Sequence, residues 1–169
     1  MARPAHSFEL GSLRLSPGEA RCTVLEVPVG ELEFGGQAYS AGGRCEARLD
    51  LSRTMSGYAL RLRFEARLSG PCMRCLEDAS EGVEVDAREV DQRGDAEELH
   101  SPYVEDGVVD LRGWARDALA LALPTQIFCG PGCLGLCVVC GENLNRDPGH
   151  GHESEPDPRW AKLSELKLD

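Results

Sequence analysis

Alternating apolar and polar residues mark two strands in the middle of the chain. Over residues 44–51 the odd-numbered positions are apolar and all even-numbered positions are charged, and a second alternating stretch covers residues 59–68. A period of two residues is typical of a strand that buries one face. The short connection at residues 52–57 suits an antiparallel hairpin. We therefore expect a hairpin that buries Leu49 and Leu62 and exposes its arginines.

Further strands are predicted on both sides of this hairpin. Residues 22–34 and 83–90 have strand character, although Pro28 places the first at a sheet edge or bulge. No helix separates these strands, which favours an antiparallel sheet. Residues 91–106 are acidic and lack an apolar period, so we expect a solvated loop there.

Helical spacing appears only after this loop. Asp110 can cap a helix over residues 111–123, and Pro124 ends it. Near the end of the chain Trp160, Leu163 and Leu166 could form the apolar stripe of a short docking helix. The predicted fold is α+β: an antiparallel β-sheet or partial β-barrel with one or two helices and a small C-terminal zinc knuckle. Its expected parts are a β-rich domain (1–124), a cysteine-rich segment (125–152) and the docking helix (153–169).

Composition narrows the setting. The 169 residues contain no stretch of signal-peptide character and none long and apolar enough for a membrane span, so we expect a cytoplasmic protein. The net charge of −11 disfavours non-specific binding to nucleic acid, because the acidic chain repels the phosphates. The charge is uneven, because residues 44–74 hold seven arginines against three acids and residues 75–110 hold thirteen acids against two arginines.

Cysteine spacing points to a structural Zn²⁺ site. Eight cysteines in a reducing compartment stay thiols unless a metal binds them. Cys137 and Cys140 are separated by two residues and followed by Gly141, which permits a tight knuckle. Four cysteines would leave no open coordination position, which excludes a catalytic zinc. The predicted ligands are Cys129, Cys133, Cys137 and Cys140.

Other donors leave alternatives open. His150 and His152 could replace Cys129 and Cys133, and the whole cluster could be free thiols. The pair Cys72 and Cys75 could join the C-terminal cysteines across space, act as a redox dithiol, or occupy a packed turn. The isolated Cys22 and Cys45 are expected in the core.

Three segments resemble the YceD-type family of large ribosomal RNA subunit accumulation proteins. They are the central pair with its arginine (residues 72–76), the helix ending in Leu-Pro (109–124), and the cysteine cluster with Leu144, Asn145 and the later Asp157–Trp160 run. The resemblance implies a bacterial, non-enzymatic ribosome-biogenesis factor. Such a factor supports accumulation or processing of large-subunit (23S) ribosomal RNA by binding.

The residues themselves suggest two binding surfaces. Outward arginines could contact RNA phosphates, or they could pair with acids across the hairpin. The acidic stretch from Glu77 to Asp110 could bind a basic protein. The expected partners are therefore ribosomal RNA and/or basic ribosomal or assembly proteins, with no membrane and no small-molecule substrate. The candidate RNA-binding residues are Arg61, Arg63, Arg67 and Arg74.

Two further functions remain as alternatives. One is a zinc-stabilised protein-interaction module unrelated to ribosomes, and the other is a thiol- or zinc-dependent enzyme. An enzyme would need a nucleophile, a base and an orienting group in one pocket. The chain has only four histidines and shows no Ser/His/Asp set or phosphate-binding glycine loop. We therefore do not expect an enzyme.

Overall fold

The computed structural model describes residues 3–34, 36–92, 94 and 99–152. The predicted docking helix, including Trp160, lies outside them. Twelve elements follow one another along the described chain: β1 (Arg3–Pro4), β2 (Ser7–Glu9), the short 3-10 helix η1 (Leu10–Leu13), β3 (Ala20–Pro28), β4 (Glu31–Phe34), β5 (Gln37–Ser40), β6 (Arg44–Arg53), β7 (Gly57–Pro71), β8 (Asp78–Gln92), β9 (Val104–Glu105), β10 (Val108–Asp110) and α1 (Leu111–Ala122).

A single twisted sheet holds most of these strands. Its order is β1-β3-β6-β7-β5-β4, and β8 pairs with β7 along the whole length of both strands. All pairs are antiparallel except β1 with β3. A strand has two edges, so β6 and β5 share one edge of β7 while β8 occupies the other. The described part of the chain is thus mostly antiparallel sheet with one α-helix, as expected for an α+β fold.

The central hairpin forms as its alternation predicts. β6 and β7 pair with Leu49 opposite Leu62, and both side chains are fully buried. Cys45 also faces the core, as expected. The expectation for Cys22 was wrong, because this residue lies on the outward face of β3 and its side chain is exposed.

The predicted strand over residues 22–34 is two strands. β3 ends at Pro28, and Gly30 adopts a positive φ of 65° before β4 begins. Glycine has no Cβ and adopts a positive φ readily, whereas L-residues rarely do, so the chain turns here and β4 pairs with β5 instead of β6. A second small sheet, β2-β10-β9, pairs the N-terminal segment with the residues before α1.

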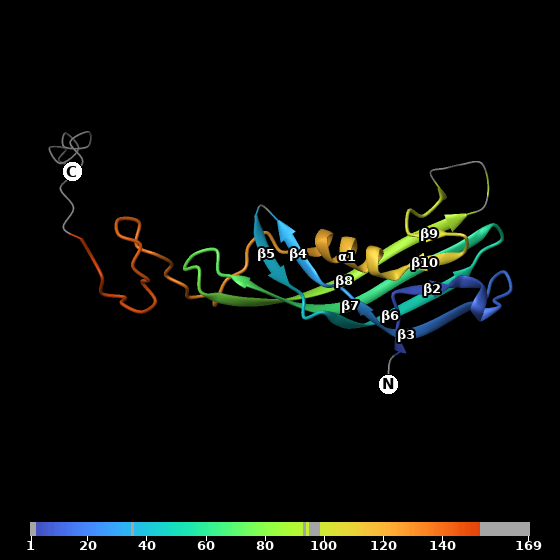
Figure 1. The fold of residues 1–169 in the computed structure, drawn as a ribbon, viewed down its shortest axis with the longest axis horizontal. Helices are drawn as coiled ribbons and strands as arrows, with labels where there is room; N and C mark the ends of the chain where they lie inside the picture. The colour runs from blue at the N-terminus through green and yellow to red at the C-terminus, as the bar shows by residue number, and fades with distance from the viewer. Residues whose placement is uncertain (1–2, 35, 93, 95–98, 153–169) are drawn as a thin grey trace, which may run out of the picture.

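Helix α1 covers one face of the large sheet (Figure 1). The Asp110 side chain accepts a hydrogen bond from the Gly113 backbone N–H at 3.0 Å, which confirms the predicted cap. The helix face toward the sheet buries Leu111, Trp114, Ala115, Ala118 and Leu119.

The acidic segment before α1 is more ordered than predicted. β8 continues to Gln92, β9 begins at Val104, and the Tyr103 ring stacks on Trp114 with 6.2 Å between ring centroids. Ser101 is buried and donates to a Glu89 carboxylate oxygen at 3.0 Å. The expectation of a wholly solvated loop was therefore wrong for residues 99–106.

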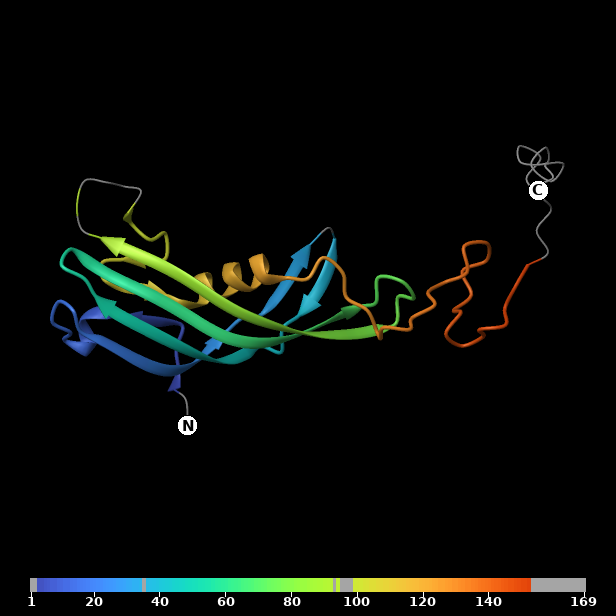
Figure 2. The same ribbon diagram turned by 180° about the vertical axis from the view of Figure 1, so that it is seen from behind.

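The molecule is elongated. β7 and β8 extend past the helix toward the same end as the C-terminal arm, residues 125–152 (Figures 1 and 2). Both views place the β7–β8 turn beside the start of this arm. Among the described residues, no helix has the length and apolar character needed to cross a membrane.

Candidate metal centres

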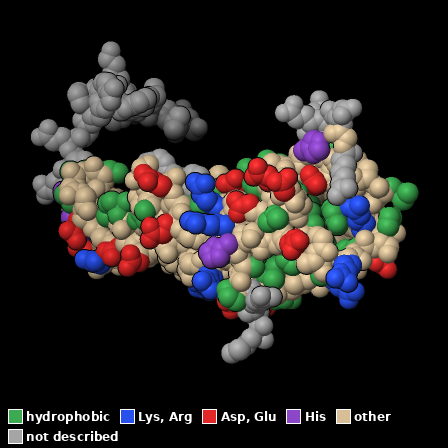
Figure 3. All heavy atoms as spheres, turned by 45° about the vertical axis from the view of Figure 1, so that its right-hand side comes forward, with side chains coloured by type: hydrophobic (Ala, Val, Ile, Leu, Met, Phe, Trp, Pro, Cys, Tyr) green, Lys and Arg blue, Asp and Glu red, His purple; other side chains and the backbone are tan. Residues whose placement is uncertain are grey.

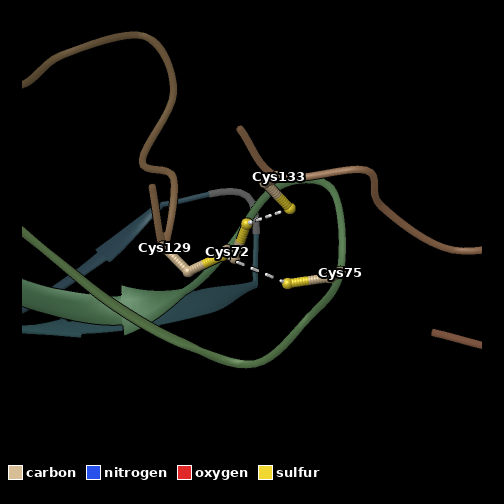
Figure 4. A group of neighbouring side chains, drawn as sticks. All are labelled: Cys72, Cys75, Cys129 and Cys133. Atoms are coloured by element: carbon tan, nitrogen blue, oxygen red, sulfur yellow. Dashed lines mark hydrogen bonds between the residues drawn. The ribbon is translucent and has the colours of Figure 1, made fainter. Parts of the chain in front are cut away.

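The tip of the β7–β8 hairpin presents two cysteines. The last strand pair is Pro71 with Asp78, and the six residues between them form a tight loop. Within it the Cys72 backbone N–H donates to the Glu77 carbonyl at 2.7 Å, and the Leu76 N–H donates to the Cys72 carbonyl at 3.0 Å. These bonds place the side chains of Cys72 and Cys75 on the same side of the loop, toward the C-terminal arm (Figure 4).

The arm is held against this loop by backbone and side-chain contacts. The Met73 N–H donates to the carbonyl of the buried Ile127 at 2.9 Å. The Arg74 guanidinium donates to the Cys133 carbonyl at 3.0 Å and lies 5.1 Å from the Phe128 ring centroid. Gly135 has a φ of 80°, and an added Cβ would lie 3.3 Å from the Arg74 carbonyl oxygen. A larger residue here would push the arm away from the tip.

Four sulfurs meet between these segments (Figure 4). The Sγ atoms of Cys72 and Cys133 are 3.7 Å apart, and those of Cys75 and Cys129 are 3.6 Å apart. All four ligand atoms lie within 4.8 Å of one another. Sulfurs around a tetrahedral Zn²⁺ with Zn–S of about 2.3 Å are about 3.8 Å apart, whereas a disulfide requires about 2.05 Å. The spacing therefore fits a shared metal ion better than cystines.

Hydrogen bonds favour thiolates at two of these sulfurs. Burial acts to raise the pKa of Cys72, but donation from the backbone N–H groups of Arg74 and Cys75 outweighs it and lowers the pKa to about 6. The Asn145 side-chain amide donates to the Cys133 sulfur at 3.4 Å and lowers the pKa of that thiol. Thiolates are the metal-binding form of cysteine.

The remaining sulfurs ionise less readily without a cation. Hydrogen bonds with Cys75 and Cys133 raise the pKa of Cys129 to about 12. Four thiolates so close together repel one another, so they ionise together only when a cation neutralises them. Three of the four cysteines are almost fully buried: Cys72 is 0%, Cys75 3% and Cys133 5% exposed. We call this group the four-cysteine cluster.

A second group lies further along the arm. Its members are Cys137, Cys140, His150 and His152, whose ligand atoms also lie within 4.8 Å of one another. The Gly141 N–H donates to the Cys137 carbonyl at 2.8 Å and Gly141 has a φ of 78°, so the predicted knuckle is present. Backbone N–H groups of Cys140 and Val139 lower the pKa of Cys137 to about 6. We call this group the cysteine–histidine cluster.

The predicted ligand set is divided between the two clusters. Cys129 and Cys133 join Cys72 and Cys75, while Cys137 and Cys140 join the two histidines. The structure therefore does not bring the four expected ligands together. The two central cysteines, the four arm cysteines and the two arm histidines are enough donors for two sets of four, but their count does not say which donors group together.

The sequence did not predict a supporting role for several residues beside the clusters. Asn145 accepts from the Leu134 N–H at 2.7 Å and donates to the Cys133 sulfur. The buried Asn143 donates to a Glu77 carboxylate oxygen at 3.2 Å, and Arg146 pairs with the same carboxylate. Glu77 belongs to the hairpin tip, so this network joins the tip to the part of the arm that carries the second cluster.

A known protein family matches the part of the chain that carries both clusters. The family model described as "Large ribosomal RNA subunit accumulation protein YceD" matches residues 60–167. This stretch includes most of β7, β8, α1 and the whole cysteine-rich arm. This chain belongs to the YceD family.

Individual relatives agree with this assignment. An uncharacterised protein of Mycobacterium tuberculosis is 32% identical over 170 residues, which cover 97% of this chain and 76% of the relative. One of Mycobacterium leprae is 35% identical over 101 residues, covering 56% of this chain and 46% of the relative. The maize protein named "Large ribosomal RNA subunit accumulation protein YCED homolog 1, chloroplastic" is 32% identical over 76 residues, covering 45% of this chain and 22% of the relative. No solved structure matches this chain.

The candidate RNA-binding arginines of this YceD-family chain have different surroundings. Arg61 donates to both carboxylate oxygens of Asp86, at 2.7 and 2.5 Å, and lowers the pKa of that acid. Arg63 donates to Asp50 at 2.5 Å. Arg74 supports the four-cysteine cluster through its bond to the Cys133 carbonyl. Of the four, Arg67 alone is exposed with neither an ion pair nor such a supporting bond to another described residue.

Glutamates form a row across the outward face of the same sheet. Glu26 in β3 is opposite Glu46 in β6, and Glu65 in β7 is opposite Glu84 in β8. Because Ala47 pairs with Phe64, Glu46 and Glu65 are neighbours in the same row. Glu46, Glu65 and Glu84 are exposed and line a broad open hollow. Figure 3 shows acidic and basic side chains interspersed over the face of the molecule that it presents.

Proposed function

We propose that this protein supports the accumulation of large-subunit ribosomal RNA as a binding factor, and that it binds a basic segment of a ribosomal or assembly protein on its sheet. The observation that carries the proposal is the YceD family match over residues 60–167. The name of the maize relative places that protein in the same process. The role needs no chemical step by this chain.

The charge on the sheet supports a basic partner. Like charges directly opposite each other destabilise a sheet, so the row Glu26, Glu46, Glu65 and Glu84 costs folding free energy unless cations approach it. Arg44 lies 3.8 Å from Glu26, but Glu46, Glu65 and Glu84 have no ion pair among the described residues. A lysine- or arginine-rich segment would neutralise them.

The edge of the sheet offers a second point of contact. In the described chain, β8 pairs only with β7, so its other edge has unpaired backbone groups. β8 holds six acids and one arginine. An extended basic peptide could add to such an edge as a further strand and pair its charges with the acids.

RNA is a weaker fit to this face. Asp86 and Asp50 already neutralise Arg61 and Arg63, so these guanidinium groups are not free for phosphates. The unpaired glutamates would repel a phosphate backbone. Effects on ribosomal RNA would then follow from delivery or protection of a basic protein.

Depletion in the native host with rescue by variants tests the proposal. We expect large-subunit ribosomal RNA to fall relative to small-subunit RNA on depletion, and wild-type protein to restore it. A triple variant of Glu46→Gln, Glu65→Gln and Glu84→Gln should fold but fail to restore the RNA. The matched control removes three exposed acids elsewhere, by Glu31→Gln, Glu33→Gln and Glu105→Gln, and should restore it.

Two results would count against the proposal. Unchanged large-subunit RNA on depletion would remove the ribosomal role. Equal rescue by the two triple variants would remove the glutamate row as the binding surface. Measuring affinity of the purified protein for a lysine-rich peptide and for single-stranded RNA at rising salt would separate the two partner classes.

A further inference from the structure

The cysteine–histidine cluster has the geometry of a complete ligand set. The Cys140 sulfur lies 3.1 Å from His150 Nε2 and 3.2 Å from His152 Nε2, and the two Nε2 atoms are 2.9 Å apart. Cys137 completes the group within the same 4.8 Å limit. Two sulfurs and two nitrogens therefore converge on one point.

Without an ion, the close contacts among these four side chains are difficult to explain as hydrogen bonds alone. A neutral histidine carries a proton on only one ring nitrogen, so one Nε2 would have to donate to the other while both also contact the Cys140 sulfur. The His150 and His152 rings meet edge to face, with centroids 4.7 Å apart. A bound cation accepts all four lone pairs at once.

Backbone geometry prepares Cys137 as a ligand. The Cys137 N–H donates to the Glu142 carbonyl at 2.8 Å and the Gly141 N–H donates to the Cys137 carbonyl at 2.8 Å, so residues 137–142 form a tight knuckle. The His150 N–H donates to the Asp147 carbonyl at 3.1 Å and so anchors the turn that returns the histidines to the knuckle. These bonds all lie within residues 137–150.

We propose that Cys137, Cys140, His150 and His152 bind a second Zn²⁺, separate from the ion held by the four-cysteine cluster. Two thiolates and two imidazoles in a tetrahedron suit zinc, whereas magnesium and calcium prefer oxygen ligands. The second ion closes a local loop of the arm, whereas the first joins the arm to the hairpin tip. This inference rests on the donor geometry and is independent of the proposed function.

The first measurement is the zinc content of the full-length reduced protein by elemental analysis. We expect two zinc ions per chain. The double variant His150→Ala and His152→Ala should retain one. The control His6→Ala and His100→Ala, which removes the two histidines outside the cluster, should retain two. One zinc in the wild type, unchanged in the His150/His152 variant, would overturn the proposal.

Cobalt substitution of the wild-type protein tests the same point even if the His150/His152 variant does not fold. Replacing zinc by Co²⁺ should fill two sites, one with the spectrum of four sulfurs and one with the spectrum of two sulfurs and two nitrogens. The His150/His152 variant should lose only the second spectrum. Saturation of the wild type at one Co²⁺ with a four-sulfur spectrum would contradict a second site.

Discussion

Asn145 connects residues 133 and 134 of the arm to the turn at Asn143 through one side chain. Its carboxamide accepts from the Leu134 N–H and donates to both the Cys133 sulfur and the Asn143 side-chain oxygen. Asn143 in turn reaches Glu77 at the hairpin tip. A single amide therefore orients one ligand of the four-cysteine cluster and helps to seat the following turn.

Replacing Asn145 by Ala should weaken metal binding at the four-cysteine cluster. The Cys133 thiolate would lose its side-chain donor, and loss of an outer hydrogen bond to a ligand typically lowers metal affinity about 10- to 100-fold. Competition with a chelator of known affinity measures the change.

Val138→Ala is the matched control for this prediction. Val138 lies in the same arm but is fully exposed, so we expect no change in affinity. Equal affinities for the Asn145→Ala and Val138→Ala proteins would show that Asn145 does not support the metal.

At the scale of elements, α1 and the β7–β8 hairpin have different structural roles. α1 closes the core over the sheet with one apolar face, and the hairpin carries Cys72 and Cys75 past the helix at its tip (Figure 1). The hairpin can do so because its fifteen paired rows keep the strands in register up to Pro71 and Asp78. Length and register of two strands therefore set the position of the site.

Two leucines of α1 give a matched test of its packing. Leu119 is fully buried, and Leu119→Ala should lower the free energy of unfolding by about 2–5 kcal/mol because it leaves a cavity. Leu121 is 89% exposed, so Leu121→Ala should change it by less than about 0.5 kcal/mol. Urea unfolding of the two variants measures both values. Similar losses in both would mean that α1 does not pack as described.

Across the whole molecule, most of the core and the two candidate metal clusters lie toward different ends. Most of the core lies between α1 and the sheet, Cys72, Cys75 and Cys133 extend it to the hairpin tip, and the cysteine–histidine cluster lies further along the arm (Figures 1 and 2). The arm's backbone bonds to the core-bearing part are few, and structural zinc in small domains contributes about 10–16 kcal/mol to folding. The folding of the hairpin tip and the arm should therefore depend on a bound metal, whereas the packing of α1 on the sheet should not.

Removing metal with a chelator under reducing conditions should loosen only that end. We expect fast amide hydrogen exchange at Met73, Cys133 and Gly141, whose N–H groups are bonded within the tip and arm. The amides of Leu49 and Leu62 in β6 and β7 should stay protected. Added Zn²⁺ should restore protection. Uniform acceleration across the chain would show that the metal stabilises the entire fold.

Local periodicity was enough to predict several elements of this protein. The alternation around Leu49 and Leu62 specified the hairpin, and Asp110 and Pro124 marked the ends of α1, because such patterns depend on residues close in sequence. The positive φ of Gly30 and the stacking of Tyr103 on Trp114 were not accessible in the same way. Both depend on where distant strands lie.

The sequence by itself determined which donors are available, and only the tertiary structure decided how they group. Cys72 and Cys133 are 61 residues apart, yet the packing of the arm against the hairpin tip brings their sulfurs to 3.7 Å. Strand register places Asp86 and Asp50 beside Arg61 and Arg63 and aligns the glutamates into a row. Residue types and short spacings are local properties, whereas ligand sets and charge pairs depend on strand pairing between segments far apart in the chain.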